Sequence, residues 1–210
     1  MTTIVDFGLG NLGSIGNMLS RFGEPSRISG NSGEILSADR LILPGIGAFD
    51  EGMNKLRDLG LVEILTSAVM NEKIPILGIC LGFQMLTKRS DEGGTEGLGW
   101  LDGETLSLKT MAENASLRVP HMGWNRVEVV GPGPLFEGMV DDARFYFVHS
   151  YGVSPTLPDA QQWGISRFEN VDFISSAGKN HIMGVQFHPE KSHRYGLQLL
   201  KNFCSIFKTS

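Results

Sequence analysis

The sequence is poor in cysteine, in basic residues and in long hydrophobic runs. Its 210 residues include only two cysteines, Cys80 and Cys204, too few for a disulfide framework. Lysine and arginine total 18 against 23 aspartate and glutamate, so no basic footprint favours nucleic-acid binding. No apolar run approaches the roughly 18 residues that span a bilayer, and the residues after Met1 do not resemble a signal peptide. We therefore expect a soluble, cytoplasmic protein with reduced thiols.

The sequence does contain a regular alternation of short buried strands and amphipathic helices. In the first half, this alternation predicts a parallel sheet with helices on both faces, with strands at 3–7, 40–43 and 75–80 and helices at 12–22, 50–59, 60–71 and after 80. The second half adds shorter strands, several of them expected to be antiparallel, at 126–130, 144–149, 164–168, 173–177 and 181–187, before a final helix at 192–205. The predicted fold is a single α/β domain over residues 1–210, with a flavodoxin-like open sheet.

Cys80 lies where the third strand is expected to turn into a helix. Gly78 and Gly82 flank it in a Gly-x-Cys-x-Gly pattern, which resembles the sharp turn that exposes the nucleophile of many hydrolases. A helix N-terminus at this place favours a thiolate. The alternative is an inert cysteine buried between a strand and a helix. Cys204 has no acid or base motif beside it and is expected to be inert.

A histidine and a carboxylate follow another apolar strand, at His188 and Glu190. A cysteine nucleophile needs a base for its proton, an acid for the leaving amine and a carboxylate that fixes the base. Cys80, His188 and Glu190 supply these three types. Metal binding is the rival interpretation, but the nearby His181 and His193 lack a compact ligand spacing.

Two glycine-rich turns follow other strands. Gly45 and Gly47 come at the carboxyl end of the second strand, where they can point N–H groups into a cleft or simply form a turn. Gly8, Gly10 and Gly13 satisfy a Gly-x-Gly-x-x-Gly count. No acidic residue closes a second strand downstream, so a tight strand-to-helix turn is favoured over dinucleotide binding.

Taken together, the motifs at 44–47, 78–84 and 187–190 resemble the class I, triad-type glutamine amidotransferases. The segments at 6–12, 120–125, 146–151 and 188–192 are similar to one subfamily, the glutaminase subunits of imidazole glycerol phosphate synthase. This resemblance covers essentially the whole chain.

The resemblance implies that glutamine is hydrolysed to glutamate and ammonia through a thioester on Cys80, with His188 as base and acid and Glu190 orienting it. It places an oxyanion hole at the N–H groups of Leu81 and of the loop around Gly47. It also implies that glutamine contacts Gly45, Gly47, Gln84, Ser150 and Tyr151. No cofactor and no metal are implied.

The resemblance further implies a partner, a (β/α)8-barrel cyclase subunit that forms a heterodimer with this chain. The ammonia would pass to that subunit, which makes imidazole glycerol phosphate and aminoimidazole carboxamide ribotide in histidine biosynthesis. Four residues would lie near the interface or the ammonia passage, namely Asn11, Asn125, Tyr146 and Lys191.

Two departures keep alternatives open. Gly152 stands where the subfamily usually has tyrosine, which could alter the pocket rim or the docking face. The tracts 97–102 and 192–196 resemble paralogues that supply ammonia to a sugar-nucleotide-aminating partner in surface polysaccharide synthesis. A further alternative, of a different class, is a flavodoxin-like binding module or a relative of cysteine peptidases without glutaminase activity.

Overall fold

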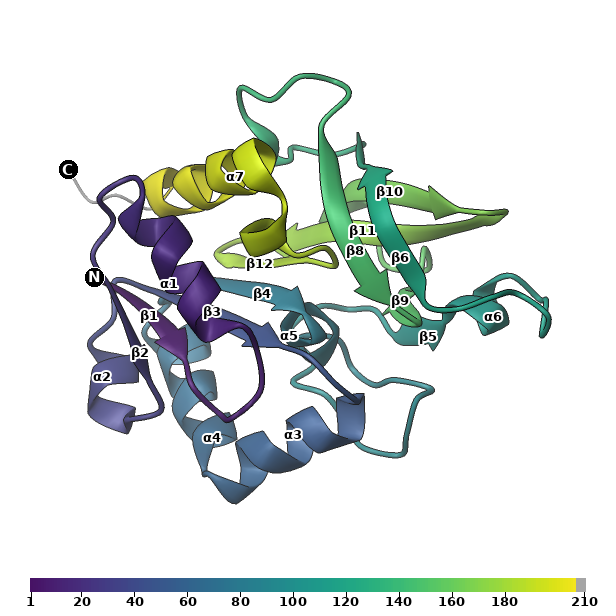
Figure 1. The fold of residues 1–210 in the computed structure, drawn as a ribbon. Helices are drawn as coiled ribbons and strands as arrows, with labels where there is room; N and C mark the ends of the chain where they lie inside the picture. Colours follow the sequence, from purple (N-terminus) through teal and green to yellow (C-terminus); the bar gives the residue numbers. More distant parts are fainter. Residues whose placement is uncertain (207–210) are drawn as a thin grey trace.

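A computed structural model describes residues 1–206, and its centre is a set of parallel strands (Figure 1). Their order is β2-β1-β3-β4-β12, and all neighbours in it are parallel. The strands are β1 (Thr2–Val5), β2 (Ser26–Ser29), β3 (Arg40–Gly45), β4 (Ile76–Cys80) and β12 (Ile182–Val185). The last four residues of the expected domain lie outside the described part.

Helices cover both faces of these strands (Figure 1). One face carries α1 (Leu12–Ser20) and α7 (His193–Ile206). The other carries α2 (Ser32–Leu36), α3 (Phe49–Asp58) and α4 (Leu61–Thr66), which continues into a π-helical turn at Ser67–Asn71.

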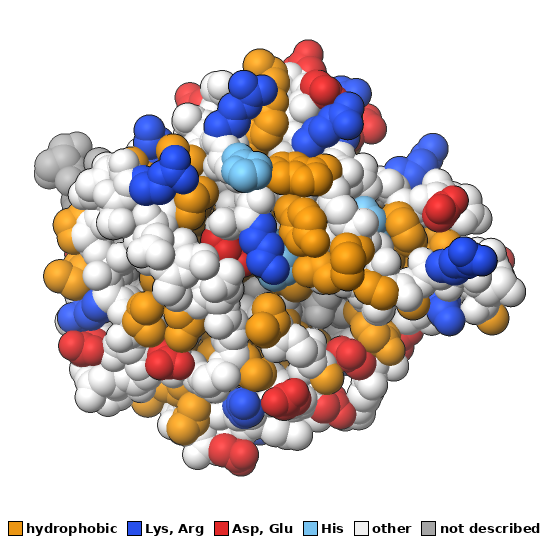
Figure 2. Space-filling model, viewed as in Figure 1, with side chains coloured by type: hydrophobic (Ala, Val, Ile, Leu, Met, Phe, Trp, Pro, Cys, Tyr) orange, Lys and Arg blue, Asp and Glu red, His pale blue; other side chains and the backbone are white. Residues whose placement is uncertain are grey.

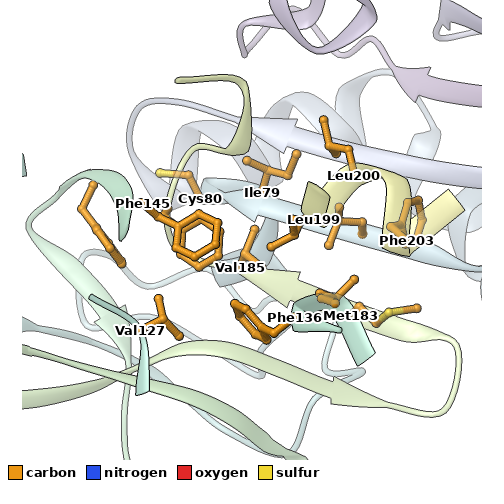
Figure 3. Close-up of a cluster of buried hydrophobic side chains, with 14 of the residues drawn as sticks. Ile79, Cys80, Val127, Phe136, Phe145, Met183, Val185, Leu199, Leu200 and Phe203 are labelled. Atoms are coloured by element: carbon orange, nitrogen blue, oxygen red, sulfur yellow. The ribbon is translucent and has the colours of Figure 1, made fainter. Parts of the chain in front are cut away.

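The strands divide their side chains between two hydrophobic cores. In β3, Ile42 joins one core whereas Leu41 and Leu43 join the other, because successive side chains of a strand point to opposite faces. Figure 3 shows the first core, in which Leu200 of α7 lies near Ile79 of β4. Strands buried on both faces read as continuous apolar runs, which is why the sequence revealed them.

The second half extends the sheet with antiparallel strands, so the predicted mixed α/β fold is confirmed. Beyond β12 come β11, β10 and β7, while the short strands β9 and β5 pair at the side of β11. Their bounds are Val171–Lys179, Gln162–Phe168 and Glu128–Val129 for the first three, and Tyr151–Val153 and Thr105–Ser107 for β9 and β5. One strand of this half, β12, is parallel to β4.

The strand predicted at 126–130 is wrong, because the chain changes sheets there. β6 (His121–Arg126) pairs with β8 (Arg144–His149) in a separate two-stranded ribbon, whereas β7 pairs with β10. Val127 lies between them and is buried. The apolar alternation across 126–130 therefore belongs to two strands.

The sequence prediction also missed several short elements. These are β2, β5, β9, α2 and α6 (Leu108–Met111). The start of α2 has a readable signal, since Asn31 caps it by accepting a hydrogen bond from the Glu34 N–H. Among residues 1–206, no helix has the length and apolar character needed to cross a membrane.

Candidate active site

Cys80 stands at the apex of a strained turn between β4 and α5 (Leu81–Met85). Its φ of 54° and ψ of −110° are unusual for a residue with a Cβ. The flanking glycines permit this turn: a Cβ on Gly82 would overlap the Leu43 carbonyl, and one on Gly78 would lie 2.8 Å from the backbone of Phe83. The sequence pattern around Cys80 thus serves close packing of α5 on β3 and β4.

His188 and Glu190 follow β12 and form a buried pair. Nδ1 of His188 lies 2.9 Å from Oε1 of Glu190, and both side chains are 2% exposed. The His188 N–H donates to the Tyr146 carbonyl at 2.9 Å, and the hydroxyl of Ser192 donates to the His188 carbonyl at 2.6 Å. These bonds fix the imidazole between the β6–β8 ribbon and the turn Pro189–Lys191.

The charges around His188 favour its protonated form. Burial lowers its pKa, but the interactions with Cys80 and Glu190 outweigh burial and raise the pKa to about 10. Nε2 of His188 is buried and makes no hydrogen bond within residues 1–206, so it is free to exchange a proton. At neutral pH His188 is thus an imidazolium beside Cys80.

A cavity of about 290 Å³ opens at Cys80. Most of the predicted site residues line it together, namely Gly47, Cys80, Leu81, Gln84, Ser150, Tyr151 and His188. Glu190 lies behind His188, bonded to its Nδ1. Gly45 is absent from the lining; a Cβ there would lie 2.9 Å from Cβ of Leu81, so its contact with a substrate stays a prediction.

The sequence analysis missed Glu92 and His149 on the cavity wall. Oε2 of Glu92 accepts a hydrogen bond from the Phe49 N–H at 2.8 Å, and burial raises the pKa of this carboxyl. Glu92 was overlooked because the acidic, glycine-rich stretch at 90–99 reads as an exposed loop. Only contacts distant in sequence bring it to the site.

His149 is 6% exposed and is joined to a second buried histidine. Its Nε2 lies 3.0 Å from Nδ1 of His121, and its Nδ1 lies 2.8 Å from the Tyr151 carbonyl oxygen. Burial, with the nearby His121, lowers the pKa of His149 to about 3, and burial lowers that of His121 to about 4. Both imidazoles are therefore neutral at pH 7. Gly152 lies behind this wall, where a Cβ would be 3.7 Å from Cε1 of His149.

Three of the four predicted interface residues, Asn125, Tyr146 and Lys191, belong to one region, and Asn11 lies on a neighbouring element. Nζ of Lys191 lies 5.6 Å from the centre of the Tyr146 ring, and Asn125 is on the strand paired with that of Tyr146. Asn11 precedes α1, a helix that contacts the turn containing Lys191. Figure 2 shows hydrophobic side chains gathered on this face. Met122 and Trp124 of β6 are 63% and 47% exposed.

The histidines considered for a metal are occupied elsewhere. Nε2 of His181 lies 2.7 Å from the Val69 carbonyl oxygen, and His193 stacks on Trp124 with ring centres 5.3 Å apart. Across residues 1–206 there is no group of three or more histidine, cysteine, aspartate or glutamate side chains suited to a metal ion.

Comparison with known proteins gives matches along nearly the whole chain. The family model described as "Glutamine amidotransferase class-I" matches residues 3–206. A relative from Pseudomonas aeruginosa named "Imidazole glycerol phosphate synthase subunit HisH 2" is 43% identical, covering 98% of this chain and all of the relative. A relative of the same name from Methanococcus maripaludis is 43% identical over 97% of this chain and 98% of its own length. A solved structure described as a glutamine amidotransferase shares the fold, with a TM-score of 0.74 at 17% identity and 98% coverage of both chains.

Proposed function

The chain belongs to the class-I glutamine amidotransferase family, and we propose that it releases ammonia from the side-chain amide of glutamine through a cysteine thioester. One observation carries the proposal. A strained Cys80 and the imidazolium of His188 line one cavity of about 290 Å³, and the buried carboxylate of Glu190 holds His188 from behind. This arrangement combines a nucleophile, an acid and base, and an orienting group.

In the first step, Sγ of Cys80 attacks the amide carbon of the substrate. The thiol proton resides on His188, and Nε2 delivers it to the departing nitrogen, so that ammonia leaves and a γ-glutamyl thioester remains. The developing oxyanion accepts hydrogen bonds from the N–H of Leu81, which begins α5, and from that of Gly47.

In the second step, water attacks the thioester. His188 takes a proton from the water, glutamate leaves, and the proton returns the Cys80–His188 pair to its starting state. Glu190 accepts the hydrogen bond from Nδ1 throughout, which keeps Nε2 directed into the cavity and stabilises the imidazolium. The sum is glutamine plus water giving glutamate plus ammonia, without a metal or cofactor.

The remaining cavity residues bind the amino-acid end of glutamine. Glu92 lines the cavity, and its negatively charged carboxylate attracts the ammonium group of the substrate. Gln84, Ser150 and Tyr151 supply polar side-chain and backbone groups on the same wall. We assign glutamine binding to the set predicted from sequence, with Glu92 added to it, namely Gly45, Gly47, Gln84, Glu92, Ser150 and Tyr151.

We assign the released ammonia to histidine biosynthesis, with this chain as the glutaminase subunit of an imidazole glycerol phosphate synthase. The relatives of that name, aligned over nearly their full length, support this assignment. The partner is a cyclase subunit with a (β/α)8 barrel that forms a heterodimer with the chain. It docks at the face with Asn11, Asn125, Tyr146 and Lys191, where Trp124 and Met122 are exposed. Both subunits are cytoplasmic, where a nucleophilic thiol stays reduced.

The test is glutamate release by this chain mixed with the cyclase subunit of its own organism, with and without the ribonucleotide acceptor. We expect low release by the chain alone and a large acceptor-dependent increase that is lost in Cys80→Ala. A matched control is Cys204→Ala, which removes the second thiol, buried in the core on α7, and leaves the response in place.

Two other outcomes overturn parts of the proposal. In the first, a sugar-nucleotide-aminating synthetase stimulates the chain, and a cyclase that works on free ammonia does not. The assignment to histidine biosynthesis would then be wrong, whereas the glutaminase activity would stand. Turnover of peptides in place of glutamine, or no labelling of Cys80 by a glutamine analogue that alkylates thiols, removes the glutaminase itself.

A further inference from the structure

Gln186 directly follows β12, on the segment that leads to His188, and no role described so far uses its side chain. It is 0% exposed. Its Nε2 lies 3.7 Å from Sγ of Cys80, and its Oε1 lies 3.1 Å from Nε2 of Gln84. A fully buried amide destabilises the folded state unless its polar atoms form hydrogen bonds. Here both ends of the amide are bonded, one of them to the nucleophile.

The orientation of this amide is dictated by its neighbours. Nε2 of Gln84 also lies 2.8 Å from the Tyr151 carbonyl oxygen. A carbonyl can only accept a hydrogen bond, so the group that Gln84 presents there is its NH2. The same NH2 group donates its second hydrogen to Oε1 of Gln186. The NH2 group of Gln186 must therefore face Sγ.

The Tyr151 carbonyl is held from its other side by the two buried histidines. Nδ1 of His149 donates to it at 2.8 Å, which leaves Nε2 of a neutral His149 to accept from Nδ1 of His121. Nε2 of His121 in turn accepts from the NH2 group of Asn125 at 3.2 Å. Asn125 is itself oriented, because its NH2 group donates to the Arg167 carbonyl and its oxygen accepts from the Arg126 N–H.

These bonds form one continuous chain from the ribbon strand β6 to the nucleophile. We propose that Gln186 is a positioning residue that donates a hydrogen bond to the Cys80 thiolate, and that the chain Asn125–His121–His149–Tyr151–Gln84 fixes its amide in that orientation. The inference rests on the proposed function, since it names a further residue of the same site. The donor stabilises the thiolate before glutamine arrives, complementing the imidazolium of His188 on the cavity side.

The test measures the reactivity of Cys80 without glutamine. The full chain is treated with iodoacetamide between pH 5 and 10, and alkylation of the peptide containing Cys80 is quantified by mass spectrometry. Gln186→Met keeps the shape but has no donor. We expect Cys80 to react about ten times more slowly at pH 7, the effect of losing one hydrogen bond to a charged group. The midpoint of the pH profile moves to higher pH.

Gln186→Glu replaces the donor by a carboxylate, and like-charge repulsion makes the shift larger still. Gln162→Met is the matched control: it also removes a buried amide, one bonded to the Leu157 carbonyl away from the cavity, and should leave the profile unchanged. If Gln186→Met does not fold, Gln186→Asn, which draws the amide back by one methylene, must give the same upward shift.

A folded Gln186→Met or Gln186→Asn protein with the wild-type pH midpoint overturns the inference. This result is distinct from failure of the proposed function, because a chain that never releases glutamate with its partner can still show the alkylation shift. Conversely, an active glutaminase whose Gln186 variants alkylate normally leaves the proposed function standing and removes only the role of Gln186.

Discussion

Two histidines on the wall of the same cavity, His149 and His188, have opposite electrostatic surroundings. Both are buried, and burial lowers the pKa of each. Around His188 the interactions with Cys80 and Glu190 overcome burial and raise the pKa to about 10. Around His149 the partners are a neutral imidazole and a carbonyl, and the pKa falls to about 3. Burial lowers the pKa of both imidazoles, and only His188 has partners whose interactions outweigh it.

The difference assigns the two imidazoles to different tasks. His188, with an unbonded Nε2, can move a proton. His149 has both nitrogens bonded and can only hold its neighbours in place. The interaction between His149 and His188 also lowers the pKa of His149, so the cavity disfavours a second cation beside the first.

The largest effect is expected from Cys80→Ala. It removes the nucleophile, and glutamate release should fall by about 10⁶-fold, as when the nucleophile of a catalytic triad is lost. It also removes one of the two groups that raise the pKa of His188, which should move downward in an NMR titration of its ring protons. Residual turnover at a tenth of the wild-type rate would contradict the assignment of Cys80.

Glu190→Gln removes the carboxylate, the second group that raises the pKa of His188. The amide keeps the shape but no longer favours the imidazolium, so the pKa of His188 falls and glutamate release drops by about 10²- to 10⁴-fold. Because the pKa of His188 is raised in the folded chain, its protonation contributes fully to the free energy of unfolding below pH 6.5. This contribution is lost as the pH rises through about 10. Urea unfolding should therefore show the wild type losing its advantage over Glu190→Gln across that window.

The control for this variant is Glu63→Gln, which changes an exposed carboxylate on α4. It should alter neither the titration of His188 nor the activity. An unchanged pKa of His188 in Glu190→Gln would mean that its interaction with Cys80 alone sustains the imidazolium.

The neutral pair gives the opposite dependence of stability on pH. The pKa values of His121 and His149 lie below the ordinary 6.5. Below that pH, the unfolded chain therefore binds protons at these histidines that the folded chain does not bind. Stability is full above pH 6.5 and declines as the pH falls toward 4 and 3, with each histidine contributing up to about 1.4 kcal/mol per pH unit. Replacing both by glutamine should flatten urea-unfolding profiles between pH 6.5 and 4. His193→Gln, at an exposed site, should not.

The sequence predicted the charged histidine and missed the neutral one for a physical reason. His188 and Glu190 are two residues apart, and the Gly-x-Cys-x-Gly turn is equally local, so short motifs contain the groups that react. Gln84 and Gln186 are 102 positions apart, and they meet only because β12 pairs with β4. Nothing near either residue in the sequence signals that contact.

The difference between local signals and distant contacts also explains which parts of the fold could be predicted. Apolar runs predicted four of the parallel strands, β1, β3, β4 and β12, because a strand buried on both faces shows its burial in its own residues. The edge strand β2 is only partly buried and was missed. The short strands β5 and β9 are fixed by pairing with distant partners. The change of sheet at Val127 is fixed in the same way, since β6 and β7 pair with different strands. Periodicity does not report pairing partners. It predicted β8 with its correct bounds, but not the ribbon that β8 forms with β6.

The smallest expected effect comes from Asn125→Asp, which gives the neutral pair the kind of partner that His188 has. A carboxylate at Nε2 of His121 favours its imidazolium, so the pKa of His121 should rise from about 4. Nδ1 of His121 still donates to His149, and the chain to Gln186 is kept, so the KM for glutamine should change only about two- to fivefold, within the range of one weak interaction. NMR titration of the ring protons and steady-state kinetics measure the two effects, and Asn54→Asp, at an exposed site on α3, is the control. If His121 stays neutral at pH 6 beside a carboxylate, burial and not the charge of the partner controls this histidine, and the distinction between the two sides of the cavity must be redrawn.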